Sequence, residues 1–311
     1  MSGLAYVFPG QGSQSVGMLV AKNAEVLATY EEASEALGYD IGKLISSGPE
    51  ELLNQTEYTQ PALLTVSVAL FRYAMSNDAD FPDVVLGHSL GEYAALVVAG
   101  AIRFEDAVKL VRMRGQYMQG AVPLGKGGMA AVLGLSGEVV HKMCSSVTRE
   151  SKNGIVEAAN FNAPEQVVVA GDNETLQVLM EKCKESGAKR AIVLNVSAPS
   201  HCSLMKPAAL KMEEQLLETE IIAPKIPVVQ NVTAAYETEP ESIRRNLVEQ
   251  VCAPVRWTES IKTLCDNHVE NFVECGPGKV LSGLIKRANK KAVVGSLSTE
   301  IEANQLASLG K

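Results

Sequence analysis

The residues best suited to chemistry are Gly87, His88, Ser89, Leu90 and Gly91, which follow a short apolar segment. A G-x-S-x-G pattern between a strand and a helix is typical of a nucleophile elbow, a sharp turn that exposes the serine hydroxyl. Glycines are needed on either side because a β-carbon there would clash within the turn. The N-terminus of the following helix favours developing negative charge. Ser89 is therefore predicted to be a catalytic nucleophile.

An elbow serine also needs a general base and donors for an oxyanion. The chain offers four histidines. The side chain of His88 should point away from its neighbour Ser89, His141 lies in a predicted helix at a solvated position, and His268 lies in a predicted surface loop. Elimination leaves His201, on a loop just ahead of a helix. No Asp or Glu stands out as its partner, so a carboxylate or a backbone carbonyl could orient the ring.

The elements that must position these residues alternate between strands and helices, which indicates an α/β fold. A loop with two glycines, Pro9 to Ser13, follows the first predicted strand. Apolar segments bounded by turn residues predict buried strands over 5–8, 84–86, 226–230 and 271–274. Helical periodicity predicts helices over 24–37, 61–75, 92–99, 104–118 and 204–218.

A change of pattern after residues 123–128 indicates an inserted unit. Strands are predicted over 129–135, 154–161, 166–170 and 190–196, helices over 138–148 and 173–186, and a turn over 162–164. The order βαββαβ is that of a ferredoxin-like unit. We therefore predict a large α/β-hydrolase-like domain with a parallel sheet, formed by residues 1–124 and 198–311. A ferredoxin-like subdomain, residues 125–197, would be inserted into it, and the chain would return to the large domain near Ser197.

Composition narrows the classes of function. The chain has 311 residues and 46% of them are hydrophobic, so a sizeable core can form. Its net charge of −8 argues against bulk nucleic-acid binding, which needs a basic surface. No apolar run is long enough for a membrane span, and no secretory signal is visible. Six cysteines without C-x-x-C pairs, and histidines without zinc-finger spacing, predict reduced thiols and no metal site. We expect a cytoplasmic protein, with an organelle left open if a transit peptide has been removed.

Taken together, these residues resemble the malonyl-CoA:acyl carrier protein transacylase family. The resemblance runs in family order over nearly the whole chain and is far more specific than any single motif. The matching stretches are FPGQGSQ at 8–14, GHSLGEY at 87–93, RMRG at 112–115, NFNAP at 160–164, PSHC at 199–202, NV at 231–232, QVCAPVRW at 250–257 and ECGPG at 274–278.

The resemblance implies roles for residues of this chain. Ser89 would be acylated, and His201 would act as the general base. The histidine would be oriented by a backbone carbonyl near Gln250. The backbone N–H groups of Gln11 and Leu90 would form the oxyanion hole.

The resemblance also implies which residues recognise the substrate. Arg114 would bind the free carboxylate of a malonyl group, because a guanidinium grips a carboxylate through two parallel hydrogen bonds. This pairing would discriminate against acetyl-CoA. Arg103 and Arg112 are better candidates for solvated helix charges. Asn160 and Asn162 are possible residues of the substrate pocket.

The implied activity is transfer of malonyl from malonyl-CoA to the phosphopantetheine thiol of acyl carrier protein, in fatty acid biosynthesis. It would proceed by a ping-pong route through a malonyl-serine, without a metal or redox cofactor. The partners would be malonyl-CoA and the phosphopantetheinylated carrier. Because the carrier should be acidic, like this chain, docking needs a local basic patch. Two clusters are candidates: Lys286, Arg287, Lys290 and Lys291, and Lys126, Lys189 and Arg190.

Three alternatives stay open at this point. A discrete trans-acting acyltransferase of a polyketide synthase would share the fold and the residues. However, Ser200 differs from the Phe often found before the histidine in malonyl-specific modules. Arg114 and a histidine without a carboxylate argue against a serine thioesterase. The intact set of site residues argues against a non-enzymatic protein with a relic site.

Overall fold

The protein is built on two separate β-sheets. The computed structural model describes residues 3–196, 198–299 and 302. The larger sheet has the strand order β10-β9-β1-β2-β7-β8, and all neighbours are parallel except the pair β7 and β8. Its strands are β1 (Gly3–Phe8), β2 (Val84–Gly87), β7 (Val228–Val229), β8 (Tyr236–Glu237), β9 (Val269–Cys275) and β10 (Val293–Leu297).

Helices cover both faces of the larger sheet, because its strands are apolar on both sides. On β1, Tyr6 and Phe8 join one buried cluster, while Ala5 and Val7 join another. The first cluster packs against α1 (Ala24–Leu37), α2 (Ile41–Ser47), α4 (Thr56–Ser76), α5 (Gly91–Val98), α6 (Phe104–Gly120), α9 (Lys206–Glu218) and α10 (Pro240–Gln250). The second packs against α11 (Trp257–Asp266) and α12 (Val280–Ala288).

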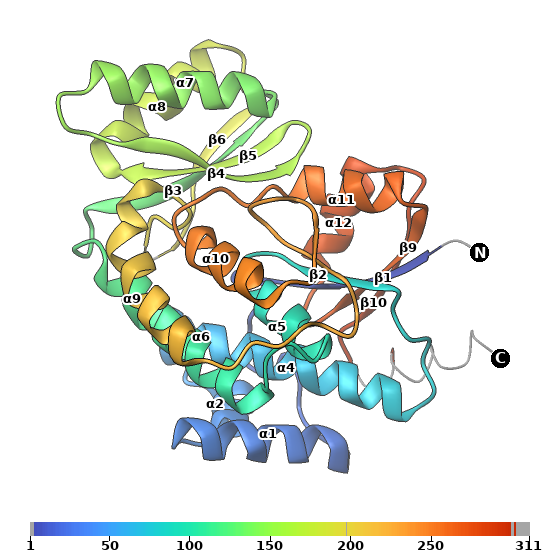
Figure 1. The fold of residues 1–311 in the computed structure, drawn as a ribbon. Coiled ribbons are helices and arrows are strands. Elements are labelled where there is room, and N and C mark those ends of the chain that lie inside the picture. The colour runs from blue at the N-terminus through green and yellow to red at the C-terminus, as the bar shows by residue number, and fades with distance from the viewer. Residues whose placement is uncertain (1–2, 197, 300–301, 303–311) are drawn as a thin grey trace.

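The smaller sheet is antiparallel, with the strand order β4-β5-β3-β6. Its elements follow the chain as β3 (Gly127–Leu133), α7 (Gly137–Glu150), β4 (Val156–Ala163), β5 (Gln166–Asp172), α8 (Asn173–Glu185) and β6 (Arg190–Val193). The helices α7 and α8 pack on one face, and the other face meets the segment that contains Cys202. Figure 1 shows this unit stacked on the larger one, with α7 and α8 outermost.

The carboxyl ends of the parallel strands bring distant segments together. The loop with Gln11 follows β1, the elbow with Ser89 follows β2, and Asn231 comes two residues after β7. Because β1 pairs with β2 and β2 pairs with β7, these three segments emerge side by side. Ligand sites of open α/β sheets form at this edge.

Two of the predicted boundaries that the structure corrects bear on the site. The turn predicted over 162–164 is wrong, because β4 continues to Ala163, which pairs with Gln166 across a tighter turn. The helix predicted from Pro61 begins five residues earlier, at Thr56. Proline usually marks a first helical turn, but burial along α4 outweighs the hydrogen bond that Pro61 cannot donate. The extra turn carries Thr56 and Gln60, which are part of the site described below.

Several elements carry too weak a signal to be predicted: α2, α3 (Glu50–Leu53), α10, α11, α12, β8 and β10. The predicted return of the chain at Ser197 falls on a residue outside the described ranges. Among the helices within those ranges, none is long and apolar enough to cross a membrane. All six cysteines are free thiols.

Candidate active site

Ser89 lies on the sharp turn between β2 and α5. Its φ of 52° falls in the left-handed region, which a serine rarely occupies. A β-carbon at Gly87 would lie 1.9 Å from the backbone carbon of Gly91, and one at Gly91 would lie 2.0 Å from the carbonyl oxygen of Phe8. The two glycines therefore allow the turn to close on itself and against β1.

The side chain of Asn231 holds this strained turn in place. Its Oδ1 accepts a hydrogen bond from the backbone N–H of Ser89 at 2.7 Å, and its Nδ2 donates to the carbonyl oxygen of Gly87 at 2.7 Å. Asn231 is only 2% exposed, so water does not compete for these bonds. One buried amide thus fixes the backbone at both Gly87 and Ser89.

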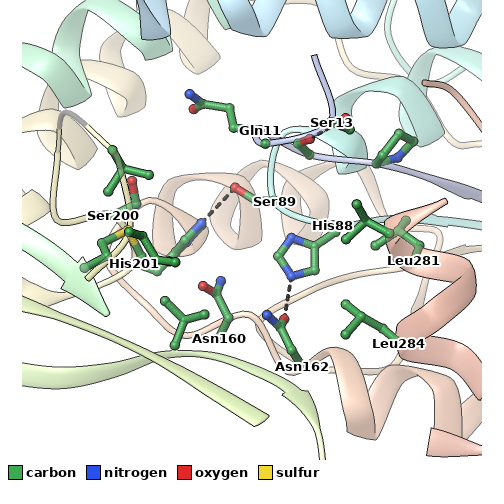
Figure 2. A pocket seen from close by; sticks show the side chains of 18 of the residues that line it. Gln11, Ser13, His88, Ser89, Asn160, Asn162, Ser200, His201, Leu281 and Leu284 are labelled. Atoms are coloured by element: carbon green, nitrogen blue, oxygen red, sulfur yellow. Dashed lines mark hydrogen bonds between the residues drawn. The ribbon is translucent and has the colours of Figure 1, made fainter. Parts of the chain in front are cut away.

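His201 lies between the nucleophile and a backbone carbonyl. Its Nε2 is 2.7 Å from Oγ of Ser89 (Figure 2). Its Nδ1 is 2.7 Å from the carbonyl oxygen of Gln250. A carbonyl oxygen can only accept, so Nδ1 carries the proton. The lone pair of Nε2 is then free to accept the proton of the Ser89 hydroxyl.

The surroundings of His201 keep its ring neutral. The side chain is buried, and burial lowers its pKa to about 3, with a further contribution from the positive charge of Arg114. The hydrogen bond to Gln250 opposes this shift only in part. The loop is anchored just beyond the histidine, where Glu157 on β4 accepts bonds from the N–H and hydroxyl of Ser203 at 2.6 and 2.9 Å.

Arg114 projects from α6 and reaches the nucleophile. Its side chain is 0% exposed. Nη1 donates to Oε1 of Gln60 at 2.9 Å, and Nη2 donates to Oε1 of Gln250 at 2.9 Å and to Oγ of Ser89 at 3.2 Å. Nε is buried without a hydrogen-bond partner among the described residues. The guanidinium therefore contacts the nucleophile through Nη2 and keeps a second donor, Nε, without a partner among the described residues.

The electrostatic setting of Arg114 is unusual for a cation. Burial lowers its pKa, and Tyr93 and Glu92 offset part of this effect. The guanidinium carbon lies 5.6 Å from the centre of the Tyr93 ring, a cation–π distance. No carboxylate forms an ion pair with Arg114 within the described ranges. An arriving anion would thus meet a cation that is not already paired.

Two backbone N–H groups could bind an oxyanion near Ser89. Leu90 opens α5 directly after the nucleophile, and Gln11 lies on the loop after β1. Neither N–H is engaged in a hydrogen bond elsewhere in the described part of the chain. The Gln11 loop packs tightly on the elbow, since a β-carbon at Gly10 would lie 2.6 Å from the carbonyl oxygen of His88.

A cavity of about 230 Å³ opens in front of Ser89 and His201. Figure 2 shows Asn160 and Asn162 of β4 on one side and Leu281 and Leu284 of α12 on another. The two asparagines are two residues apart on one strand and line the same wall. The cavity therefore lies between the two sheets and is lined from both.

Not every histidine and arginine singled out from the sequence is part of this cluster. His141 and His268 are exposed. His88 turns away from Ser89 and forms a 2.8 Å hydrogen bond with Oδ1 of Asn162, and burial lowers its pKa. Arg103 is exposed, as expected, and pairs with Asp106.

One expectation about these side chains is wrong, and three residues were missed. Arg112 is not a solvated charge but is partly buried, paired with Glu57 at 3.0 Å and placed over the Tyr39 ring. Sequence reasoning assigned no role to Gln60, Glu92 or Asn231, although two of them fall in the matching stretches. Their burial depends on tertiary packing. Within the described ranges, no group of three or more potential ligands could hold a metal ion.

The sequence is similar to known proteins over nearly its whole length. The model of the acyl transferase domain family matches residues 5–310. The chain is 52% identical to the malonyl CoA-acyl carrier protein transacylase of Salmonella typhimurium over 92% of this chain and 93% of that protein. It is 46% identical to the enzyme of that name from Bacillus subtilis, covering 94% and 92% of the two chains.

Solved structures agree closely with this fold. The malonyl CoA-acyl carrier protein transacylase of Coxiella burnetii has a TM-score of 0.95 at 43% identity, with 99% of this chain and 97% of that chain covered. A malonyl-transacylase solved in complex with a type II polyketide acyl-carrier protein has a TM-score of 0.96 at 44% identity, with 99% and 100% covered. The chain therefore belongs to the acyl transferase domain family, among the malonyl CoA-acyl carrier protein transacylases.

Proposed function

We propose that this protein transfers the malonyl group of malonyl-CoA to the phosphopantetheine thiol of an acyl carrier protein, through a malonyl ester of Ser89. One observation carries the proposal. The hydroxyl of Ser89 lies between a neutral imidazole that can take its proton and a buried guanidinium without a carboxylate partner. The first feature suits acyl transfer, and the second suits an acyl group that ends in a carboxylate.

The first half-reaction forms the ester. As Oγ of Ser89 attacks the thioester carbonyl, its proton passes to Nε2 of His201, and Nδ1–H stays bonded to Gln250. The N–H groups of Leu90 and Gln11 are proposed to bind the oxyanion. Collapse breaks the carbon–sulfur bond, and the sulfur of CoA leaves with the proton from His201.

The second half-reaction reverses these transfers with a new thiol. The phosphopantetheine thiol gives its proton to His201 and attacks the ester carbonyl. Collapse breaks the bond to Oγ, and His201 returns the proton to Ser89. The malonyl group ends on the carrier, and the enzyme regains its starting state. The chemistry proposed here needs no metal or redox cofactor.

Arg114 is proposed to select the malonyl group. Once Oγ is part of an ester, the fork formed by Nε and Nη2 can pair with the malonyl carboxylate. An acetyl group would leave this buried donor without a partner, which costs binding energy. Asn160 and Asn162 are proposed to line the acyl and pantetheine path, because both face the cavity.

The carrier is proposed to dock beside α12. This helix lines the cavity through Leu281 and Leu284. A basic cluster begins in its last turn and continues beyond its end, and all four residues are exposed: Lys286, Arg287, Lys290 and Lys291. In the other candidate cluster, Lys189 is paired with Glu165, which reduces its net charge. Relatives named for acyl carrier protein support a role in fatty acid biosynthesis.

The finer description of the fold also remains a proposal. We propose an α/β-hydrolase-like domain from residues 1–124 and 198–311, with a ferredoxin-like subdomain at 125–197. The elbow after a central parallel strand supports the first, and the βαββαβ order of the smaller unit supports the second. A cytoplasmic location likewise stays a prediction of the sequence.

Mass spectrometry of carrier loading tests the proposed function. The protein is incubated with phosphopantetheinylated carrier and with malonyl-CoA, methylmalonyl-CoA or acetyl-CoA in turn. Malonyl-loaded carrier is expected to form, with little acetyl loading. Rapid release of free malonate without loaded carrier would instead indicate a serine thioesterase.

A further inference from the structure

Glu92 is a fully buried carboxylate within one helical turn of the nucleophile. It lies in the first turn of α5, three residues after Ser89, and is 0% exposed. It does not line the cavity in front of Ser89 and His201. Its oxygens accept three hydrogen bonds, all from neutral groups: Nε2 of Gln230 at 3.0 Å, the N–H of Asn231 at 2.8 Å and Nε2 of Gln250 at 3.1 Å.

The bond to Gln250 decides which way that amide faces. An ionised carboxylate can only accept, so the NH₂ group of Gln250 must face Glu92. The same NH₂ group donates to the carbonyl oxygen of Ser89 at 3.0 Å. Oε1 of Gln250 is thereby turned toward Arg114, from which it accepts at 2.9 Å. A flipped amide would set donor against donor and release the guanidinium.

The bond to Asn231 reaches the nucleophile by a second route. Glu92 fixes the backbone of Asn231, whose side chain holds Ser89 and Gly87 in the strained turn. Both routes therefore start at one carboxylate and end at groups that contact the Ser89 hydroxyl or its backbone.

The third hydrogen bond of Glu92, from Gln230, leads away from the site. Gln230 donates to Glu92 and must then turn its Oε1 outward, where it accepts from Nδ2 of Asn246 at 2.6 Å. Asn246 lies on α10, the helix that ends with Gln250. The hydrogen bonds of Glu92 therefore reach α10 both at Asn246 and at Gln250, whose carbonyl oxygen binds His201.

We propose that Glu92, as a carboxylate, is a positioning residue that orients Gln250 and Asn231 and thereby sets Arg114, His201 and Ser89 for malonyl transfer. This inference rests on the proposed function. Burial raises the pKa of Glu92 to about 7, while its hydrogen bonds and Arg114 oppose the shift. The experiments are therefore set at pH 8, above this pKa, to favour the carboxylate form.

The test compares acylation of Ser89 by malonyl-CoA and acetyl-CoA in the wild type and in Glu92→Gln. The substituted amide can donate, so Gln250 loses its fixed orientation and Arg114 loses a fixed acceptor. The ratio of kcat/KM for malonyl over acetyl is expected to fall about tenfold or more. In the Gln250→Met background, Glu92→Gln should change this ratio little, because Glu92 acts on Arg114 mainly through the side chain of Gln250.

Asp172→Asn is the matched control. Asp172 also accepts three hydrogen bonds from neutral groups, at Thr175 and Ile155, but it lies in the smaller unit away from the elbow. This variant should lower thermal stability and keep the malonyl-to-acetyl ratio. If Glu92→Gln also kept the ratio while losing stability, Glu92 would be structural only and the inference would be overturned.

A second measurement needs no variant. Neutron diffraction of the wild-type protein at pH 8 should show no deuteron on either oxygen of Glu92 and the ND₂ group of Gln250 facing it. A deuteron on Glu92, or a reversed amide, would overturn the inference. Failure of the wild type to form malonyl-Ser89 would contradict the proposed function instead, so the two outcomes are distinguishable.

Discussion

Nδ1 of His201 lies 2.7 Å from the backbone carbonyl oxygen of Gln250, a partner that no side-chain substitution can remove. A carboxylate in this place would stabilise a charged ring and raise its pKa, whereas the carbonyl fixes the tautomer without supplying a charge. The base therefore stays neutral beside the buried cation of Arg114. Ser89 works with a histidine supported by backbone rather than with an acid-based triad.

The depressed pKa of His201 predicts a specific dependence of stability on pH. Its pKa is about 3 in the folded protein and about 6.5 in the unfolded chain. Below pH 6.5 the unfolded chain therefore binds a proton that the folded protein does not. As the pH falls from about 6.5 toward about 3, the free energy of unfolding should decrease by about 1.4 kcal/mol per pH unit for this residue alone.

Urea unfolding measures this effect when it is done at pH 7.5 and again at a pH about one unit below the pKa of His201 in the unfolded chain. The wild type should lose about 1.4 kcal/mol more than His201→Gln, which has no ring to protonate. Equal losses in the two proteins would show that His201 titrates normally.

Replacement of Arg114 by alanine should remove the preference for malonyl. The expected fall in kcat/KM for malonyl-CoA is about 10- to 100-fold, because a charge-assisted bond in a buried site is lost. Acetyl transfer should fall far less. Arg112→Ala, on the same helix but paired with Glu57, is the control and should keep the preference. A full preference for malonyl in Arg114→Ala would show that the clamp is assigned to the wrong residue.

Gly91→Ala should destabilise the elbow. The new β-carbon would lie 2.0 Å from the carbonyl oxygen of Phe8, a backbone atom that cannot move aside without disturbing β1. We expect a loss of about 3 kcal/mol or more in the free energy of unfolding, together with loss of acylation. At Gly283, within α12, an added β-carbon would meet no atom within 4 Å apart from its chain neighbours and its own helix backbone. Gly283→Ala should therefore raise the free energy of unfolding by about 0.5–1 kcal/mol. Thermal unfolding that ranked the two variants alike would contradict the geometry of the turn.

Charge reversal on α12 should weaken carrier docking. In the double variant Lys286→Glu with Arg287→Glu, the KM for the acidic carrier should rise about tenfold, because like charges now face each other. The KM for free pantetheine, a neutral thiol, should rise far less. Lys142→Glu on α7 is the control. If reversal of both basic clusters left the KM for the carrier unchanged, docking would not depend on either.

The sequence predicted best what local chemistry decides. The helix over 24–37 matches α1 at both ends, because Asn23 caps its first turn and Gly38 ends it with a φ of 74°. The elbow was recognisable because glycine spacing and flanking elements are local too. The βαββαβ order of the smaller unit could likewise be predicted from periodicity alone.

What the sequence could not show depends on contacts between distant segments. Ser89 and His201 are 112 residues apart, and their 2.7 Å contact follows from strand order and from the packing of the two units. The sequence does not reveal Gln60, because Pro61 is typical of a helix start and Gln60 precedes it. Glu92 looked like an ordinary polar residue of a helix, and only burial beneath the elbow reveals its three bonds.

The central claim is that Ser89 carries the malonyl group between two thiols, and intact-mass spectrometry tests it most directly. The protein is mixed with malonyl-CoA, freed of CoA and then given phosphopantetheinylated carrier. We predict one malonyl adduct on the wild type, none on Ser89→Ala, and disappearance of the adduct as the same mass appears on the carrier. An adduct that persists in Ser89→Ala, or one that is lost to water with no loaded carrier, would contradict the account.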